Sequence, residues 1–379
     1  MSVSGRVETG TAARAARMGR VRTAMVEAGV DALLLSLGAD LPWLTGYEAM
    51  PLERLTMLVL PADGDATLVV PRLEAPRVHE APGLFELRPW NETEDPVGIV
   101  AGLLGRRRRL AVSDRAWASA LLRLQGAVPG AEWSAASRVT GPIRAVKDAA
   151  EVECLRAAGA AADRVAAQLQ AGLIPLVGRA EAEVSADISQ RLRDEGHERV
   201  NFAIVGSGPN SASPHHHAGP RVIEAGDVVV CDFGGVLSLD GGPGYCSDIT
   251  RTVVTGEPSA ELRELYSVLE DAQARAVAAA RAGTTCEEVD GVARRVIAAA
   301  GFGDCFIHRT GHGIGLEEHE DPYLVQGNGT PLEPGHAFSV EPGIYLAGRF
   351  GARLEDIVVA TEEGPLALNS VDHALAVVG

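Results

Sequence analysis

Four carboxylates of the sequence stand in segments whose apolar residues predict buried β-strands. Asp232 interrupts DVVVCDF, and Asp248 lies within YCSDITRT. Glu341 in FSVEP and Glu355 in LEDIVV repeat the pattern. A carboxylate is costly to bury unless it is protonated, paired or bound to a cation. A single case would indicate a structural ion pair, but four together predict that the acids share a positive centre.

The cations near these segments are too few to neutralise the acids. Lysine is scarce there, and the nearby basic residues are Arg251 and Arg353. Two arginines do not obviously balance four carboxylates at close range. We therefore expect bound metal ions to supply the missing positive charge.

A glycine-rich segment adds histidines to the candidate site. The segment HRTGHGIGLEEHE carries His308, His312 and His319 within twelve residues. Glycine allows the backbone to approach a ligand closely. A lone histidine is more often a core or surface residue, but the acidic strands favour metal binding here. An imidazole with several carboxylates forms an oxygen-rich set of the kind that Mn(II), Co(II), Fe(II) or Zn(II) accepts.

A third cluster, GSGPNSASPHHH, ends in three consecutive histidines that begin at His215. Its glycines resemble a phosphate-binding loop only loosely, because the chain contains no GxxxxGK[ST] pattern. The three histidines could be adventitious. Because these turn-forming residues follow the predicted strand FAIV, we place the loop at the mouth of the site.

The elements that must position these motifs predict two domains. Helical and strand patterns alternate up to about residue 140, which is typical of an α/β domain, here residues 12–141. Gly141 and Pro142 then predict a break in the structure. The rest of the chain, residues 145–379, predicts an α+β domain in which pairs of helices alternate with antiparallel strands.

Four long helices are expected in this second domain, with strand-rich intervals between them. They span residues 147–171, 179–194, 260–282 and 286–300. Thr284 and Glu287 have the spacing of a capping box, in which the two side chains satisfy backbone N–H groups of the first turn. We expect this pair to begin the last helix.

Composition and charge exclude several classes of protein. The 379 residues are 46% apolar and 22% charged, which is typical of globular domains. The net charge of −17 repels phosphate backbones, so no nucleic-acid partner is expected. The sequence has neither a membrane-length apolar run nor the apolar core of a signal peptide. The five cysteines lack a CxxC arrangement, which favours a reducing, cytoplasmic location.

Six ordered segments resemble the metal-dependent peptidases of the pita-bread fold, above all Xaa-Pro dipeptidases (prolidases) and Xaa-Pro aminopeptidases. They are SGPNSASPH, VVCDFGG, GYCSDITRT, HRTGHGIGLEEHE, VEPGIY and ARLEDIVV. The resemblance spans the whole chain, since those enzymes also carry a smaller N-terminal α/β domain of the creatinase type. It implies hydrolysis of the bond before proline in small peptides, and a homodimer.

The resemblance also implies roles for individual residues. Two divalent ions, with Mn(II) as the first expectation, would be held by Asp232, Asp248, His312, Glu341 and Glu355. The catalytic residues that it implies are His215, His319, Glu341 and Arg353. The histidines would donate to the oxyanion, and Glu341 would carry a proton to the leaving nitrogen. Arg353 would support the site or bind a substrate carboxylate.

One spacing departs from the family pattern. Asp232 and Asp248 are sixteen positions apart, which is longer than the usual interval. The extra residues lie in a Gly- and Pro-rich stretch that predicts a longer hairpin tip. We expect the two aspartates still to face one another, with Asp240 as a minor alternative ligand. The added length leaves the substrate preference open.

Three other functions remain as alternatives. A metal-free amidinohydrolase-like enzyme and a non-catalytic binding protein can both be built on this fold, but such relatives usually lose the carboxylates that this chain retains. Methionine aminopeptidase activity fits the additional N-terminal domain and the His-rich loop poorly. The motifs do not decide between a dipeptidase and an aminopeptidase.

Overall fold

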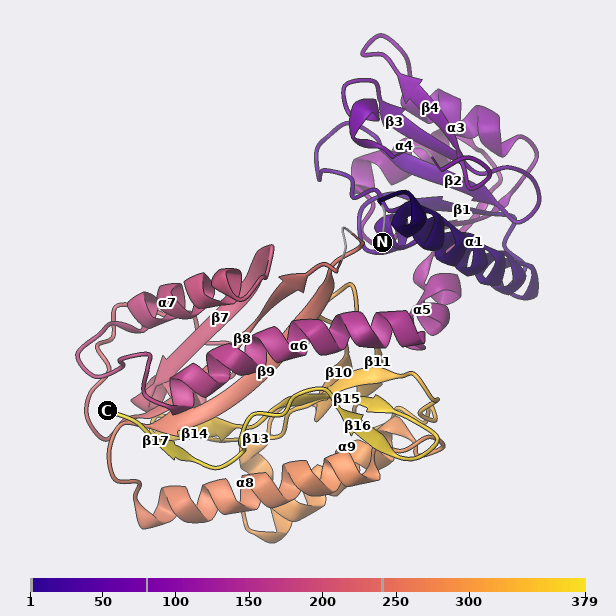
Figure 1. Cartoon of the computed structure of the whole chain (residues 1–379). Coiled ribbons are helices and arrows are strands. Elements are labelled where there is room, and N and C mark those ends of the chain that lie inside the picture. The colour runs from indigo at the N-terminus through magenta and orange to yellow at the C-terminus, as the bar shows by residue number, and fades with distance from the viewer. Residues whose placement is uncertain (1–2, 80, 240–241) are drawn as a thin grey trace. The chain divides into compact units, whose positions relative to one another are not determined.

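Figure 1 shows the computed structural model of the chain, which describes residues 3–79, 81–239 and 242–379. The chain divides into two compact units. Residues 1–144 form most of the first unit, and residues 145–239 and 244–379 form the second. All five cysteines are free thiols. Among the described residues, no helix combines the length and the apolar character that a membrane span requires.

The first unit is built on a mixed six-stranded sheet in the order β4-β3-β2-β1-β5-β6. Its elements are α1 (Val3–Glu27), β1 (Ala32–Leu35), α2 (Asp40–Thr45), β2 (Met57–Pro61), β3 (Thr67–Pro71), β4 (Glu86–Trp90), α3 (Pro96–Leu104), β5 (Arg109–Val112), α4 (Ala118–Ala127), β6 (Glu132–Ala135) and α5 (Ser137–Ala145). Strand β1 pairs antiparallel with β2 and parallel with β5. Leu34, Val69 and Val100 are fully buried between the sheet and its helices. This is the α/β domain that the sequence predicted.

The break expected at Gly141 and Pro142 is wrong, because helix α5 continues through both residues. Two side chains of the helix hold it in place against Asp40. Thr140 Oγ1 donates to Asp40 Oδ2 at 3.0 Å, and Arg144 Nη1 donates to Asp40 Oδ1 at 3.1 Å. These residues are four apart and therefore lie on one face of the helix. The two contacts offset the hydrogen bond that Pro142 cannot donate.

The second unit contains two larger sheets and a two-stranded ribbon. The sheets have the orders β17-β9-β8-β7 and β11-β10-β12-β15-β16, and β13 pairs with β14. The helices are α6 (Ala149–Gln170), α7 (Glu181–Asp194), α8 (Ala260–Ala279) and α9 (Cys286–Ala299). The strands are β7 (Arg199–Ser207), β8 (Val228–Leu237), β9 (Tyr245–Val254), β10 (Gly311–Gly313), β11 (Glu320–Leu324), β12 (Ala337–Val340), β13 (Gly343–Leu346), β14 (Phe350–Arg353), β15 (Asp356–Ala360), β16 (Pro365–Ala367) and β17 (Ala376–Val377).

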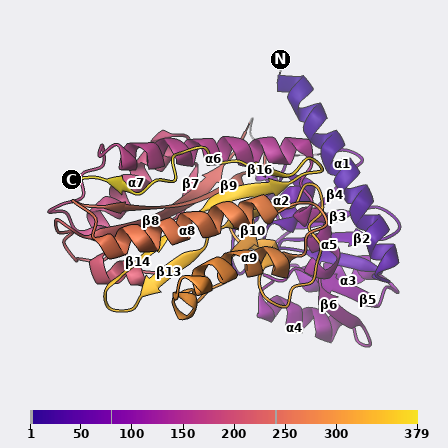
Figure 2. The same cartoon turned by 90° about the horizontal axis from the view of Figure 1, so that it is seen from below.

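Two helix pairs cover the sheets of this unit. Helices α6 and α7 pack on the sheet of β7, β8 and β9 through Val165, Ile188 and Phe233. Helices α8 and α9 lie against one another and cover β12 and β15, with Leu269 and Phe338 in their core (Figures 1 and 2). The strands therefore lie between the two helix pairs, as in the expected α+β catalytic domain.

The capping box of the last long helix lies one residue later than the sequence suggested. Thr285 is the N-cap of α9, and its hydroxyl accepts a hydrogen bond from the Glu288 backbone N–H. The Glu288 side chain in turn accepts from the Thr285 backbone N–H at 2.8 Å. Thr284 instead lies in the preceding turn, where its N–H donates to Arg281 O. Both pairs have the same spacing, so the pattern could not distinguish them.

Candidate metal centre and active site

Two of the predicted acids lie on neighbouring strands of one hairpin. In the register of β8 and β9, Asp232 is opposite Thr250 and Asp248 is opposite Gly234. Because strand side chains alternate between faces, both aspartates project from the same face of the hairpin. The lengthened connection lies beyond this pairing, which continues to Leu237 and Tyr245. Asp240, the alternative ligand, lies outside the described residues.

The other two acids flank strands, whereas the sequence placed them inside strands. The pairing of β12 with β15 ends at Val340 and Asp356. Glu341 directly follows Val340, and Glu355 directly precedes Asp356. Their backbone N–H groups form hydrogen bonds outside the pairing of β12 with β15. Glu341 N donates to Thr310 O at 2.8 Å, and Glu355 N donates to Thr250 O at 3.3 Å. The second bond joins Glu355 to the strand that carries Asp248.

His312 is the central residue of β10, between two glycines whose positions admit no side chain. A Cβ on Gly311 would lie 1.8 Å from Ser339 O, and a Cβ on Gly313 would lie 2.2 Å from Asp321 O. His312 Nδ1 donates to Gly313 O at 3.1 Å, so Nε2 carries the lone pair. Nε2 lies 3.3 Å from Glu341 Oε1 and 3.7 Å from Asp248 Oδ2. Burial lowers the pKa of His312 to about 3, which keeps the ring neutral.

The site brings together several hydrogen-bond acceptors, and too few hydrogen-bond donors lie among them to satisfy them all. One ligand atom each from Asp248, His312 and Glu355 lie within 4.8 Å of one another, and all three residues are buried. Burial, followed by repulsion from neighbouring carboxylates, raises the pKa values of Asp248 and Glu355 well above their usual range. Burial also raises the pKa of Glu341 to about 7. Asp232 Oδ1 is buried and has no hydrogen-bond partner among the residues that the structure describes. These residues suit divalent cations, because such ions bind carboxylate oxygen and imidazole nitrogen as ligands.

Arg353 supports this cluster with nearly all of its donors. Its Nη2 donates to Asp232 Oδ2 at 2.6 Å, and its Nε donates to Thr250 Oγ1 at 3.0 Å. Its Nη1 donates to Tyr345 Oη at 2.9 Å and to Pro214 O at 3.3 Å. Thr250 Oγ1 donates to Glu355 Oε2 at 2.6 Å. Arg353 is therefore committed to holding Asp232 and, through Thr250, Glu355.

All the predicted site residues line one cavity of about 460 Å³. The lining includes His215 and His319 together with the five candidate ligands and Arg353. His319 and His312 have ring centroids 3.8 Å apart. Phe202 and Ile204 supply an apolar wall. His308, to which the sequence analysis gave no role, and Arg309, which it did not consider, also line the cavity.

A buried glutamate outside the cavity holds the loop that carries His215. Glu181 of α7 accepts hydrogen bonds from Ser207 N at 2.8 Å, Asn210 Nδ2 at 3.0 Å and His216 Nε2 at 2.7 Å. These bonds lower its pKa although burial opposes them. The SGPN motif contained a signal for this contact, since a turn rich in polar groups must satisfy them somewhere. Sequence patterns gave no indication that the partner is Glu181.

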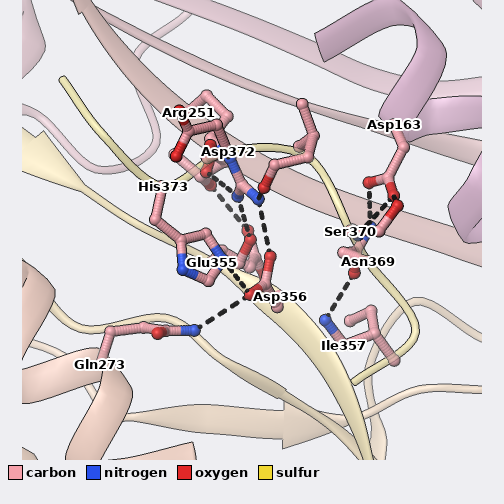
Figure 3. A network of polar contacts seen from close by, with 12 residues as sticks. Asp163, Arg251, Gln273, Glu355, Asp356, Ile357, Asn369, Ser370, Asp372 and His373 are labelled. Atoms are coloured by element: carbon pink, nitrogen blue, oxygen red, sulfur yellow. Dashed lines mark hydrogen bonds and ion pairs between the residues drawn. The ribbon is translucent and has the colours of Figure 1, made fainter. Parts of the chain in front are cut away.

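Arg251, considered from the sequence as a neutralising cation, serves a neighbouring network instead (Figure 3). Its Nη2 pairs with Asp356 Oδ1 at 2.8 Å, and its Nη1 donates to Glu355 O at 2.7 Å. His373 Nε2 lies 2.6 Å from Asp356 Oδ2, which ties the C-terminal segment to β15. The same segment accepts from Arg251 Nε at Asp372 O. Arg251 thus fixes the backbone of Glu355 rather than its carboxylate.

Comparison with known proteins identifies the family of the chain. Residues 153–362 match the model of metallopeptidase family M24, and residues 17–146 match the creatinase/prolidase N-terminal domain. The chain therefore belongs to metallopeptidase family M24. It is an enzyme with a pita-bread catalytic domain, which confirms the resemblance of the six motifs.

Individual relatives match almost the full length of the chain. The probable dipeptidase PepE of Mycobacterium bovis is 45% identical over 368 residues, which are 96% of each chain. The crystal structure of dipeptidase PepE from Mycobacterium ulcerans has a TM-score of 0.90 at 47% identity and covers 97% of this chain and 98% of its own. A prolidase from Thermococcus sibiricus has a TM-score of 0.88 at 34% identity, with 96% and 98% covered.

Proposed function

We propose that this M24 peptidase hydrolyses Xaa-Pro dipeptides with two divalent metal ions. The main support is the buried cluster of acceptors, in which Asp232 Oδ1 has no hydrogen-bond partner in the described part of the chain and His312 presents a lone pair. The proposed ligands are Asp232, Asp248, His312, Glu341 and Glu355. The naming of similar proteins as dipeptidases and a prolidase supports the substrate class.

Bound metal ions would supply Lewis-acid polarisation and a water nucleophile available near neutral pH. Mn(II) is the first candidate, with Co(II), Fe(II) and Zn(II) as alternatives, because the donor set is rich in carboxylate oxygen. The protein contributes the positions of the acids. Arg353 donates a hydrogen bond to Asp232, and Thr250 donates one to Glu355. Ser339 donates one to Glu341.

His319 is suited to donate a hydrogen bond into the cavity. Arg309 Nη2 lies 3.2 Å from His319 Nδ1, and an arginine can only donate. Nδ1 is therefore the acceptor, and the proton of the neutral ring lies on Nε2. Burial lowers the pKa of His319 and favours that neutral form. We assign His319, with His215 on the facing loop, to hydrogen bonding of the substrate carbonyl oxygen as negative charge develops there.

Glu341 is the proposed proton carrier. Its carboxylate accepts from Ser339 Oγ at 3.1 Å and lies against His312 in the buried cluster. A carboxylate in this position can accept a proton from the attacking water and return it to the leaving nitrogen. A proline nitrogen in a peptide bond carries no hydrogen, so it must gain a proton to leave as an amine.

The test combines metal content with substrate choice. The protein should contain two divalent ions per chain, lose activity with a chelator and regain it with Mn(II). It should hydrolyse Gly-Pro faster than Gly-Pro-Gly. Asp232→Asn and Glu355→Gln should lower both metal content and activity, with Glu261→Gln, an exposed acid paired with Arg349, as the control. Full activity without metal would favour the amidinohydrolase-like alternative, and faster cleavage of Gly-Pro-Gly would favour an aminopeptidase.

We also propose a cytoplasmic location and a homodimer, as the family resemblance implies. Sedimentation equilibrium of the purified protein would test the second proposal. A monomer at micromolar concentration would contradict it.

A further inference from the structure

The cavity contains a second arginine whose guanidinium is largely uncommitted. The cations among its lining residues are Arg309 and Arg353. Arg353 has a side chain only 3% exposed and spends all three nitrogens on protein acceptors. Arg309 is partly exposed, and the hydrogen bond of its guanidinium within the described residues is the donation to His319 Nδ1. It forms no ion pair with a carboxylate of the described part of the chain.

An aromatic platform holds Arg309 in the cavity. The guanidinium carbon lies 4.4 Å from the ring centroid of Tyr323. Stacking on an aromatic face leaves the edges of the guanidinium free to donate hydrogen bonds. The free edge is the fork that binds a planar carboxylate with two parallel bonds. Arg309 therefore lines the cavity with guanidinium donors that remain available to an anion.

Tyr323 also places the guanidinium of Arg309 close to the proposed metal ligands. Tyr323 is directly opposite His312 in the register of β10 and β11. Directly opposite residues of a sheet project from the same face with neighbouring Cβ atoms. The C-terminal carboxylate of a dipeptide is one residue beyond the scissile carbonyl, and one residue spans at most about 3.6 Å. The anchor of such a substrate must therefore lie beside the metal ligands, as Arg309 does.

We propose that Arg309, stacked on Tyr323, binds the free C-terminal carboxylate of the substrate and so restricts the enzyme to dipeptides. This assignment rests on the proposed function and gives Arg309 the role that the sequence offered to Arg353. A free carboxylate would otherwise meet the acidic lining, which includes Glu318, Glu341 and Glu355. A longer peptide has a neutral amide at the same position and gains nothing from the guanidinium.

The test compares Gly-Pro with Gly-Pro amide in steady-state kinetics of the metal-loaded enzyme. The wild type should prefer the free acid. Arg309→Ala should raise KM for Gly-Pro about 10- to 100-fold, since a hydrogen-bonded charge pair contributes about 1.5–3 kcal/mol. It should change KM for the amide less than about 2-fold, and Arg309→Lys should recover part of the preference. Arg349→Ala is the matched control, because Arg349 also lies over an aromatic ring, Phe350, but outside the cavity.

Two outcomes overturn the assignment. One is an unchanged preference for the free acid in Arg309→Ala. The other is an equal loss of kcat for both compounds, which would show that Arg309 acts only through His319. Ala-Leu and its amide repeat the comparison without proline. If the wild type cleaves Ala-Leu but not Gly-Pro, the Xaa-Pro proposal fails while the role of Arg309 is still measured.

A binding measurement tests the assignment without requiring turnover. Gly-Pro and its amide are titrated calorimetrically into metal-loaded His215→Ala protein, which keeps every proposed metal ligand, with and without Arg309→Ala. The acid should bind more tightly, and Arg309→Ala should abolish that difference. Equal affinities with Arg309 present, or no binding of either compound, contradict the assignment.

Discussion

At the scale of single residues, the site is a set of acids that the chain alone cannot neutralise. The sequence identified these acids because a charged residue within an apolar strand is costly without a partner. It did not assign partners to the two nearby arginines: Arg353 pairs with Asp232, whereas Arg251 pairs with Asp356. Arg309 was missed because a lone arginine before a glycine-rich motif has no distinguishing pattern. Its role depends on the ring beneath it, which only the strand register reveals.

The raised pKa of Glu341 predicts that, in the metal-free protein, this residue lowers the free energy of unfolding as the pH rises. Its pKa is raised from 4.5 to about 7, so between these pH values the folded state holds a proton that the unfolded chain releases. The stabilisation from this group is therefore present below pH 4.5 and lost as pH rises through 7. With chelator present, Glu341→Gln should be more stable than the wild type by up to about 3 kcal/mol above pH 7, but not at pH 4.5.

Urea denaturation at a series of pH values measures this difference. The comparison with Glu341→Gln is needed because neutral buried His312 has a lowered pKa and acts in the opposite direction. Saturating Mn(II) should reverse the order, because ions that bind only the folded state stabilise the wild type more. A stability difference that does not change with pH would contradict the prediction.

The donor role of His319 predicts separable effects on catalysis and on metal binding. His319→Ala should keep two ions per chain, because its ring stacks on His312 without being a proposed ligand. Turnover should fall about 100- to 1000-fold, as for loss of one oxyanion donor. Metal analysis beside kcat measures both. Normal turnover would remove the assigned role, and loss of metal would make His319 part of the ligand set. His217→Ala, an exposed neighbour of the loop, is the control.

At the scale of elements, two antiparallel pairs carry the acids, and hydrogen bonds between their backbones align them. The Gly- and Pro-rich interval predicted the hairpin of β8 and β9, but the sequence analysis predicted neither the pairing of β12 with β15 nor where that pairing ends. Glu341 and Glu355 leave the ladder because their N–H groups find Thr310 and Thr250 instead. Helix α5 shows the same limit, since Thr140 and Arg144 bind Asp40 from a hundred residues away and override the break that Pro142 suggests.

The network around Arg251 predicts a stability cost that reaches the site. Arg251 is fully buried, and it joins β9, β15 and the C-terminal segment. Arg251→Met leaves Asp356 without its main cation, which should cost about 3–5 kcal/mol in urea denaturation. Metal affinity should fall as well, because the Glu355 carbonyl loses its donor. Arg251→Lys, which keeps the charge, should cost less if the first variant does not fold.

His373→Gln is the control for this network. His373 also contacts Asp356, but its side chain is 42% exposed and glutamine can still donate a hydrogen bond. Its expected cost is about 1 kcal/mol or less. An Arg251→Met protein as stable as the wild type would show that the network is not needed to hold β15.

At the scale of the whole molecule, each unit contains its own core. The core of the first unit draws on residues between Ala32 and Trp133. The cores beneath the two helix pairs of the second unit draw on residues between Ala162 and Val378. The sequence analysis placed a domain boundary near residue 140 from the change of pattern there, because period and composition average over many residues. Every proposed ligand belongs to the second unit.

We therefore predict that residues 145–379 fold alone and bind the two metal ions. A domain that buries its own apolar core can fold without its neighbour. The starting residue matters, because Lys147 forms a buried ion pair with Glu320 at 2.5 Å, and Lys147 N donates to Gly335 O. A fragment that begins at Ala149 loses both contacts and should unfold several degrees lower than one that begins at Ala145. Calorimetry with and without Mn(II) measures both fragments. If the longer fragment shows no cooperative transition, the second unit depends on the first for its fold.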